Sequence, residues 1–208
     1  MALAKAPNSP ELRRFLTEQG ATLLSFPPLA ADDNWFDASQ VLAAGTGTPK
    51  VYVLTVLAAG MNSAVCPGYP VVPVYVVVDA AGDNFASVSM VLTGVDQFGI
   101  QRSETIAATN SSGTWTGTAT KAYLSLISAV TTVTCASGDV TASDTQIIGF
   151  VKTVGLMRQI SATTDVIAKT FDGAADAGTI SAAHSTYVIA GTPDAAKVLN
   201  LLIRPTLR

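Results

Sequence analysis

The stretch VSMVLTGVDQFGIQRSETI, residues 88–106, has the pattern of two strands joined by a tight turn. Val, Met and Leu alternate with Ser, Val and Thr from 88 to 93, and two further sets alternate from 100 to 107. A period of two places successive side chains on opposite faces of a strand. Between the two runs, Asp96-Gln97-Phe98-Gly99 favours either a type I turn or a three-residue loop that ends in a left-handed glycine. The stretch therefore predicts a β-hairpin with two different faces.

The second strand of this hairpin carries Arg102 and Glu104, two residues apart and therefore on the same face. A catalytic cluster would need a base or a metal ligand beside them, and the neighbouring sequence offers none. We therefore interpret Arg102 and Glu104 as residues of a solvated or interfacial sheet face.

The composition predicts a β-rich protein whose surface is partly covered by other subunits. The chain has 208 residues, of which 49% are hydrophobic and only 13% charged, whereas about a quarter of the residues are charged in typical domains. Val and Thr are abundant and favour strands, while Gly, Asp and Asn mark turns. A chain of this length is long enough to bury a core of its own.

Turn signals separate the apolar and alternating segments beyond residue 45 at intervals typical of a sandwich or barrel. The expected strands are 50–57, 71–79, 86–95, 100–108, 114–118, 122–134, 145–152, 165–170, 186–190 and 198–204. The fold class that we predict is mainly β, an antiparallel β-sandwich or barrel. Pro70 and Pro73 lack backbone donors, so we expect the strand 71–79 to begin at a sheet edge.

The first 45 residues differ from the rest and predict an irregular N-terminal arm. Residues 11–19 have the composition of a short helix, and Gly20 is suited to end it. The remainder, 46–208, is the predicted β-sandwich-like domain, which could divide into subdomains at 46–84 and 85–208.

Large apolar side chains follow the predicted helix without clear periodicity. They either pack on the arm's own domain or anchor a neighbouring subunit, as aromatic side chains often do. The candidate interface residues are Phe26, Trp35 and Phe36 of the arm, together with Arg102 and Glu104.

The sequence lacks the constellations that most enzymes need, and we predict no catalytic, cofactor-binding or metal site. His184 is the only histidine, and no G-x-S-x-G elbow, G-x-G-x-x-G turn or P-loop occurs. The segments 32–35 and 172–176 are rich in Asp but lack the alternating ligands and central glycine of a calcium loop. We read His184 as a residue near the start of a strand.

Charge and hydropathy predict neither a nucleic-acid partner nor a membrane partner. The net charge is −3, and no basic cluster is larger than Arg13-Arg14. No apolar run approaches the length of a membrane span, and the N-terminus lacks the apolar core of a signal peptide. Assembly in a cytoplasm would keep Cys66 and Cys135 as reduced thiols, although a disulfide between them is the alternative.

Three motifs resemble a group of structural proteins of tailed bacteriophages. The first is the hairpin LTGVDQFGIQRSETI at 92–106, and the second is GTWTGTATKAY at 113–123. Here Ala119-Thr120 is an insertion and Tyr123 replaces a phenylalanine of the family pattern. The third is the segment with Gly155, Leu156 and Arg158. The resemblance covers roughly residues 85–208 and rests on turn and strand motifs.

The resemblance implies a virion component, most often a capsid decoration (cement) protein on the capsid surface, assembled in the host cytoplasm. Its implied partners are the major capsid protein and copies of itself in a homotrimer. Two other classes stay open. One is a neck or tail adaptor or a fibre-base protein, and the other is a glycan-binding receptor module that uses exposed aromatics such as Trp115 or Tyr69. Fold analogy by itself cannot choose between them.

Overall fold

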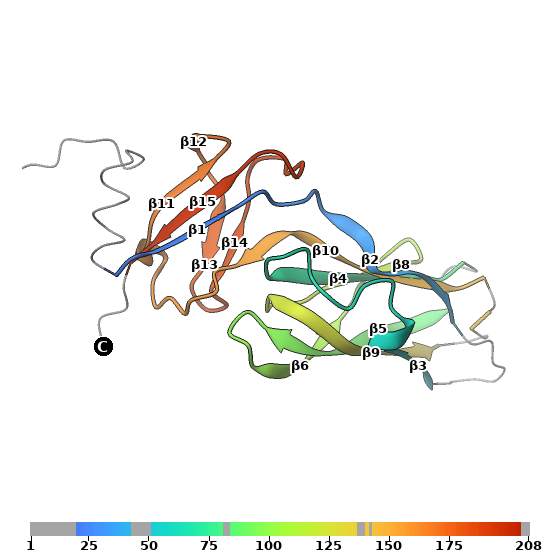
Figure 1. Ribbon diagram of the computed structural model, residues 1–208. Helices are drawn as coiled ribbons and strands as arrows, with labels where there is room; N and C mark the ends of the chain where they lie inside the picture. The colour runs from blue at the N-terminus through green and yellow to red at the C-terminus, as the bar shows by residue number, and fades with distance from the viewer. Residues whose placement is uncertain (1–19, 43–50, 81–83, 137–139, 142, 205–208) are drawn as a thin grey trace, which may run out of the picture. The chain divides into compact units, whose positions relative to one another are not determined.

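The computed structural model divides the chain into two compact units (Figure 1). It describes residues 20–42, 51–80, 84–136, 140–141 and 143–204. We call Ala31–Gly155 the central domain, and Met1–Ala30 together with Leu156–Arg208 the terminal domain. This division differs from the predicted boundaries after residues 45 and 84, because the two ends of the chain pair with each other.

Antiparallel strands dominate both domains, so the predicted fold class is confirmed. The strands are β1 (Thr22–Phe26), β2 (Asp32–Val41), β3 (Val51–Leu57), β4 (Val71–Val78), β5 (Phe85–Asp96), β6 (Gln101–Ala107), β7 (Thr109–Ser111), β8 (Thr114–Thr118), β9 (Tyr123–Cys135), β10 (Thr145–Gly155), β11 (Val166–Phe171), β12 (Ala174–Ala175), β13 (Thr179–Ser181), β14 (Thr186–Val188) and β15 (Leu199–Ile203). Short 3₁₀ turns occupy Ala58–Gly60 and Thr163–Asp165. The helix predicted at 11–19 lies outside the described residues.

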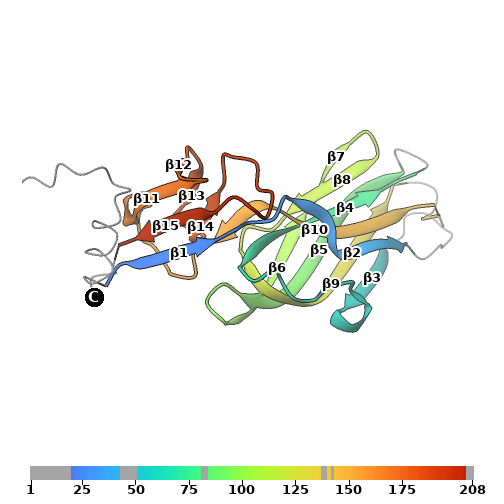
Figure 2. The same ribbon diagram turned by 45° about the horizontal axis from the view of Figure 1, so that its top comes forward.

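The central domain is a sandwich of two antiparallel sheets, which are joined where Val71 of β4 pairs with Tyr123 of β9 (Figure 2). One sheet has the order β2-β10-β4-β8-β7, and the other has the order β3-β9-β5-β6. Along the chain, successive strands therefore alternate between the two sheets from β2 to β5. They alternate again from β8 to β10. This connectivity is that of a jelly roll.

Apolar side chains from both sheets fill the space between them. The fully buried ones include Tyr75, Met90, Leu92, Leu126 and Ile148. Burying a side chain of this size contributes roughly 1.5–3 kcal/mol. The Tyr75 hydroxyl crosses the core from β4 and donates to the Ile106 carbonyl of β6 at 2.9 Å, so its polar end is satisfied inside the sandwich.

Strand β4 lies between β10 and β8 from Val74 onwards, whereas its first residues have no partner in β8, in line with the predicted start at a sheet edge. The carbonyl of Pro73 accepts from Ala119, just past the end of β8. The carbonyl and the nitrogen of one strand residue point the same way, so the missing donor of Pro73 also faces this side. The ladder with β8 begins only at Val74, and Pro73 therefore removes no ladder bond.

The terminal domain is built from both ends of the chain. Its sheet has the order β1-β15-β11-β12, and β13 and β14 pair with each other as a hairpin. Thr22–Phe26 pairs in register with Leu199–Ile203. Asp172 and Gly173, at φ of 54° and 78°, turn the chain from β11 to β12, as expected of a two-residue hairpin turn.

The expected irregular arm is wrong for residues 22–26 and 32–41, which are strands of two different domains. Strand β2 escapes prediction because it contains three aspartates, which are depleted in strands. Its pairing with β10 also shifts register twice, so the side chains do not alternate regularly.

Close approach of β2 to β10 depends on Gly149. A Cβ at this position would overlap the backbone of Asp32 and Asp33. We predict that Gly149→Ala lowers the free energy of unfolding by about 3 kcal/mol, because the rigid backbone of β2 would have to move. Gly60→Ala is the matched control, since nothing lies within 4 Å of its Cβ. Chemical denaturation would measure both, and equal stability of the two variants would contradict this account.

Candidate functional site

The solvent side of the β3-β9-β5-β6 sheet is a regular surface of the central domain. Cross-strand pairing places its side chains in three rows. The rows are Val53, Thr132, Ser89 and Ala107; Thr55, Val130, Val91 and Thr105; and Leu57, Ser128, Thr93 and Ser103. We call these twelve residues the outer face.

The alternation of each strand separates the outer face from the core. Val88, Met90 and Leu92 of β5 are buried, whereas Ser89, Val91 and Thr93 between them are half-buried or exposed. The same holds for β9, where Ala129, Thr131 and Val133 are buried. Sequence reasoning found the alternation in single strands but missed the face, because the rows exist only once the register between four strands is known.

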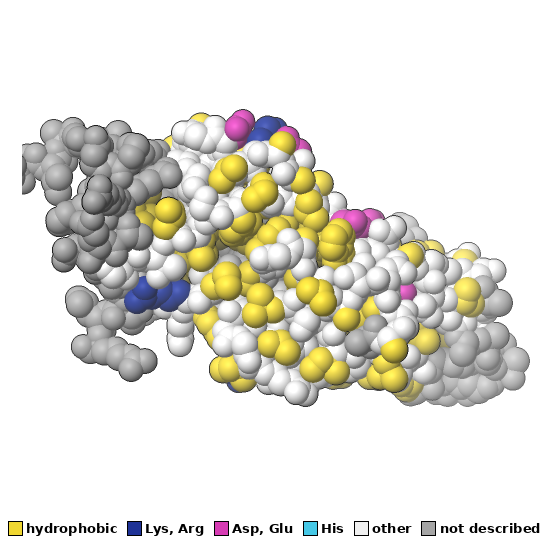
Figure 3. All heavy atoms as spheres, viewed as in Figure 1, with side chains coloured by type: hydrophobic (Ala, Val, Ile, Leu, Met, Phe, Trp, Pro, Cys, Tyr) yellow, Lys and Arg dark blue, Asp and Glu magenta, His cyan; other side chains and the backbone are white. Residues whose placement is uncertain are grey.

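The outer face carries no charged side chain. It consists of Val, Leu and Ala interspersed with Ser and Thr, and the Thr93 and Ser103 hydroxyls form a hydrogen bond of 2.8 Å across β5 and β6. Figure 3 shows one side of the molecule, on which hydrophobic side chains are many and charged side chains are few. Burying such a face against another protein would desolvate hydroxyls, which can find new partners, but no charge.

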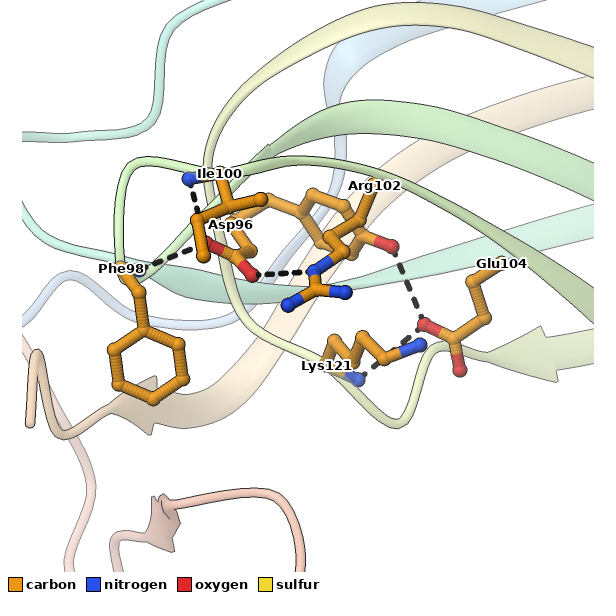
Figure 4. Close-up of polar contacts among 7 residues, drawn as sticks. Asp96, Phe98, Ile100, Arg102, Glu104 and Lys121 are labelled. Carbon is orange, nitrogen blue, oxygen red and sulfur yellow. Dashed lines mark hydrogen bonds and ion pairs between the residues drawn. The ribbon is translucent and has the colours of Figure 1, made fainter. Parts of the chain in front are cut away.

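Charged residues gather instead at the β5–β6 hairpin, and Asp96 organises its turn (Figure 4). One carboxylate oxygen accepts from the backbone of Phe98 and Ile100, each at 2.9 Å. The other oxygen pairs with the Arg102 guanidinium at 3.2 Å. Gly99 has a φ of 78° and its amide donates to the Asp96 carbonyl. Both turn features predicted for this tetrapeptide are therefore present together.

Glu104 fastens the hairpin to the segment before β9. Its carboxylate accepts from the Thr120 backbone and hydroxyl at 2.7 and 2.5 Å. Longer contacts of 3.4 Å come from the Lys121 amide and the Tyr123 hydroxyl. Burial, and next the charge of Glu104, raises the pKa of Tyr123, so this hydroxyl keeps its proton and remains a donor. The geometry gives Glu104 a structural role.

The predicted interface residues differ in how far they are exposed. Phe36 is completely buried in the central domain, so it is a core residue and cannot anchor a neighbour. Trp35 is half-buried, with its ring 5.7 Å from that of Phe150 and its indole N–H donating to the Val65 carbonyl. Phe26 is half-buried in β1 of the terminal domain. Arg102 is about half exposed beside Asp96.

Two aromatic residues proposed for glycan binding are core residues. Trp115 and Tyr69 are 8% and 5% exposed, so neither offers a ring on which a sugar could stack, and that expectation is wrong. His184 is exposed in the turn between β13 and β14. Phe98 and Ile100 are exposed apolar side chains at the turn of the β5–β6 hairpin.

A small polar cluster lies inside the sandwich. Asp37 of β2 is 2% exposed and accepts from the Gln40 amide at 3.2 Å. Burial raises the pKa of Asp37, while hydrogen bonds from Gln40 and Gln146 oppose the rise. Thr131 of β9 donates to Gln146 of β10, so the cluster links the two sheets.

The described residues show no group of three His, Cys, Asp or Glu side chains that could hold a metal ion. None of the helices in this part of the chain has the length and apolarity that a membrane span requires. Comparison with known proteins found no matching family model, curated protein or solved structure.

Removing the carboxylate of Glu104 should loosen the hairpin. We predict that Glu104→Ala lowers the free energy of unfolding by roughly 2 kcal/mol, because the Thr120 and Lys121 amides lose a charged acceptor. Thr105→Ala, the adjacent exposed position, should change it by less than about 0.5 kcal/mol. Urea denaturation of both variants tests this, and indistinguishable midpoints would rule out the structural role of Glu104.

The two cysteines should behave as protected thiols. Cys66 and Cys135 are buried and are not joined in a disulfide, and burial raises the pKa of Cys66 to about 12. Because the thiolate is the reactive form, we predict no rapid reaction with a thiol reagent in the native protein. After denaturation without reductant, both cysteines should react. A chain whose thiols stay unreactive after denaturation would contain the disulfide instead.

Proposed function

We propose that this protein is a structural component of a phage virion that binds the outside of the capsid and bridges shell subunits. The observation that carries the proposal is the outer face, a four-stranded sheet surface without a charged side chain. A surface of this kind can be covered by another protein at little electrostatic cost. It also accounts for the low proportion of charged residues, 13%, in a chain of this length.

The sequence resemblance supports the same class of function. Its best-matched motif, at 92–106, is the β5–β6 hairpin, in which Asp96 and Glu104 have the structural roles described above. The motif residues thus preserve the geometry of a sheet edge and do not form a reaction centre. Jelly rolls recur in viral shells, which is support by analogy only.

Binding to a repeating shell would add many modest contacts, because each site recurs with the symmetry of the lattice. The major capsid protein is the partner that the proposal names. The glycan-binding alternative loses its support, since the aromatics on which it depended are buried.

A charge placed at the centre of the outer face should prevent capsid binding. Val91 lies in the middle row and is 37% exposed, so Val91→Lys can fold while adding a charge that the contact would have to desolvate. We predict that purified Val91→Lys binds undecorated capsids at least tenfold more weakly than the unchanged protein in a sedimentation assay. Ala183→Lys, which adds the same charge in an exposed turn of the terminal domain, should bind normally.

The copy number in purified virions separates decoration from the neck or tail alternative. Near parity with the major capsid protein would support decoration, whereas a single ring of about six or twelve copies would support a neck or tail position. Absence from virions, or equal binding by Val91→Lys and the unchanged protein, would overturn the proposal.

A further inference from the structure

Strand β3 is an edge strand of the β3-β9-β5-β6 sheet. Its seven residues, VYVLTVL, pair along their full length with β9, from Val51 opposite Thr134 to Leu57 opposite Ser128. Among the described residues, no strand pairs with the other side of β3, and Figure 2 shows β3 at the end of the sheet beyond β9. The backbone groups on that side form a template for another strand.

The other sheet edges of the central domain carry the features that discourage such pairing. Strand β2 contains three aspartates, and β6 contains Arg102 and Glu104. Strand β7 is only three residues long. Charges and short length both protect an edge strand from intermolecular pairing. Among these described edge strands, only β3 is longer than three residues and free of charge, proline and glycine.

Two apolar side chains of β3 are also accessible. Val53 and Leu57 are 60% and 59% exposed, whereas the outer-face residues of the adjoining β9 are half-buried. An open hollow of about 370 Å³ lies beside the strand, lined by Gln40, Thr55, Val56, Leu57, Ala59 and Gly60. Space therefore exists at this edge for the side chains of a further strand.

We infer that β3 pairs antiparallel with β3 of a second copy of this chain, which joins two β3-β9-β5-β6 sheets into one. The absence of charge favours a second copy as the partner. When a strand pairs with its own copy about a two-fold axis, residue i faces residue j and residue j faces residue i. Charges of one sign on such a strand would face one another across the axis and repel. A different partner could neutralise them, so an uncharged edge suits self-pairing in particular.

Self-pairing extends the outer face across the two-fold axis. Val53, Thr55 and Leu57 lie on this face, in the same rows as β9 and β5. The joined sheet would present two outer faces side by side, both uncharged. The inference stands independently of the proposed function, because self-association can be measured on the purified protein without any capsid.

The test compares two lysine variants on the same sheet face. Thr55→Lys places a charge on β3, and Thr105→Lys places it on β6, at the opposite edge of the same row. Sedimentation equilibrium over a range of concentrations would give the mass of the unchanged protein and of both variants. We expect a dimer for the unchanged protein and for Thr105→Lys. Thr55→Lys should weaken dimerisation roughly a hundredfold, because two like charges would lie close to the axis.

Amide hydrogen exchange gives a second measurement that does not depend on a variant. In the dimer, amides of β3 that face away from β9 should exchange more slowly at high than at low protein concentration, while the β6 edge should show no change. The inference is overturned if the unchanged protein is monomeric throughout, if its mass is that of three chains, or if Thr55→Lys dimerises normally. Loss of the dimer in Thr105→Lys would also overturn it and would indicate contact through the outer faces.

Discussion

The register between β5 and β9 is the constraint on which the central domain depends. These strands pair from Phe85–Cys135 to Asp96–Tyr123 and form the middle of their sheet. A slip of one residue would exchange the faces of a strand. Met90 and Leu92 would then lie in water, and the hydroxyls of Ser89 and Thr93 would enter the core. The energetic penalty for such an exchange fixes which residues form the outer face.

Polar contacts at the hairpin end and inside the sandwich reinforce this register. Asp96 closes the turn that aligns β5 with β6, and Glu104 holds β6 against the segment that leads into β9. Inside the sandwich, Thr131 of β9 donates to Gln146 of β10, so the two sheets are tied to each other as well. The charged residues that first suggested chemistry thus stabilise the position of a strand, and their carboxylates are occupied by backbone and side-chain donors.

In the described part of the chain, charged side chains lie away from the outer face and from the β3 edge. Arg102 and Glu104 lie on the opposite side of β6 from the outer face, where charges at an edge also discourage unwanted pairing. The outer face and the β3 edge carry no charge, so each can be buried without leaving an ion unpaired. The outer face would contact a partner stacked on the sheet, whereas the β3 edge would contact a partner that extends the sheet in its own plane. A chain with both could contact a copy of itself and a different partner at the same time.

Local pattern in the sequence was enough to predict most strands beyond residue 45, the Asp96–Gly99 turn and the mainly β class, because alternation and turn chemistry act between near neighbours in the chain. Tertiary structure decided the rest. Strands β1 and β2 exist through partners more than a hundred residues away, and Leu24 pairs with Leu201 although neither segment predicts the other. Pro73 is accommodated in β4 because of where β8 ends, and Phe36 and Trp115 are core residues because two sheets meet over them. The outer face likewise requires the register of four strands, a non-local property that the alternation of any single strand leaves undetermined.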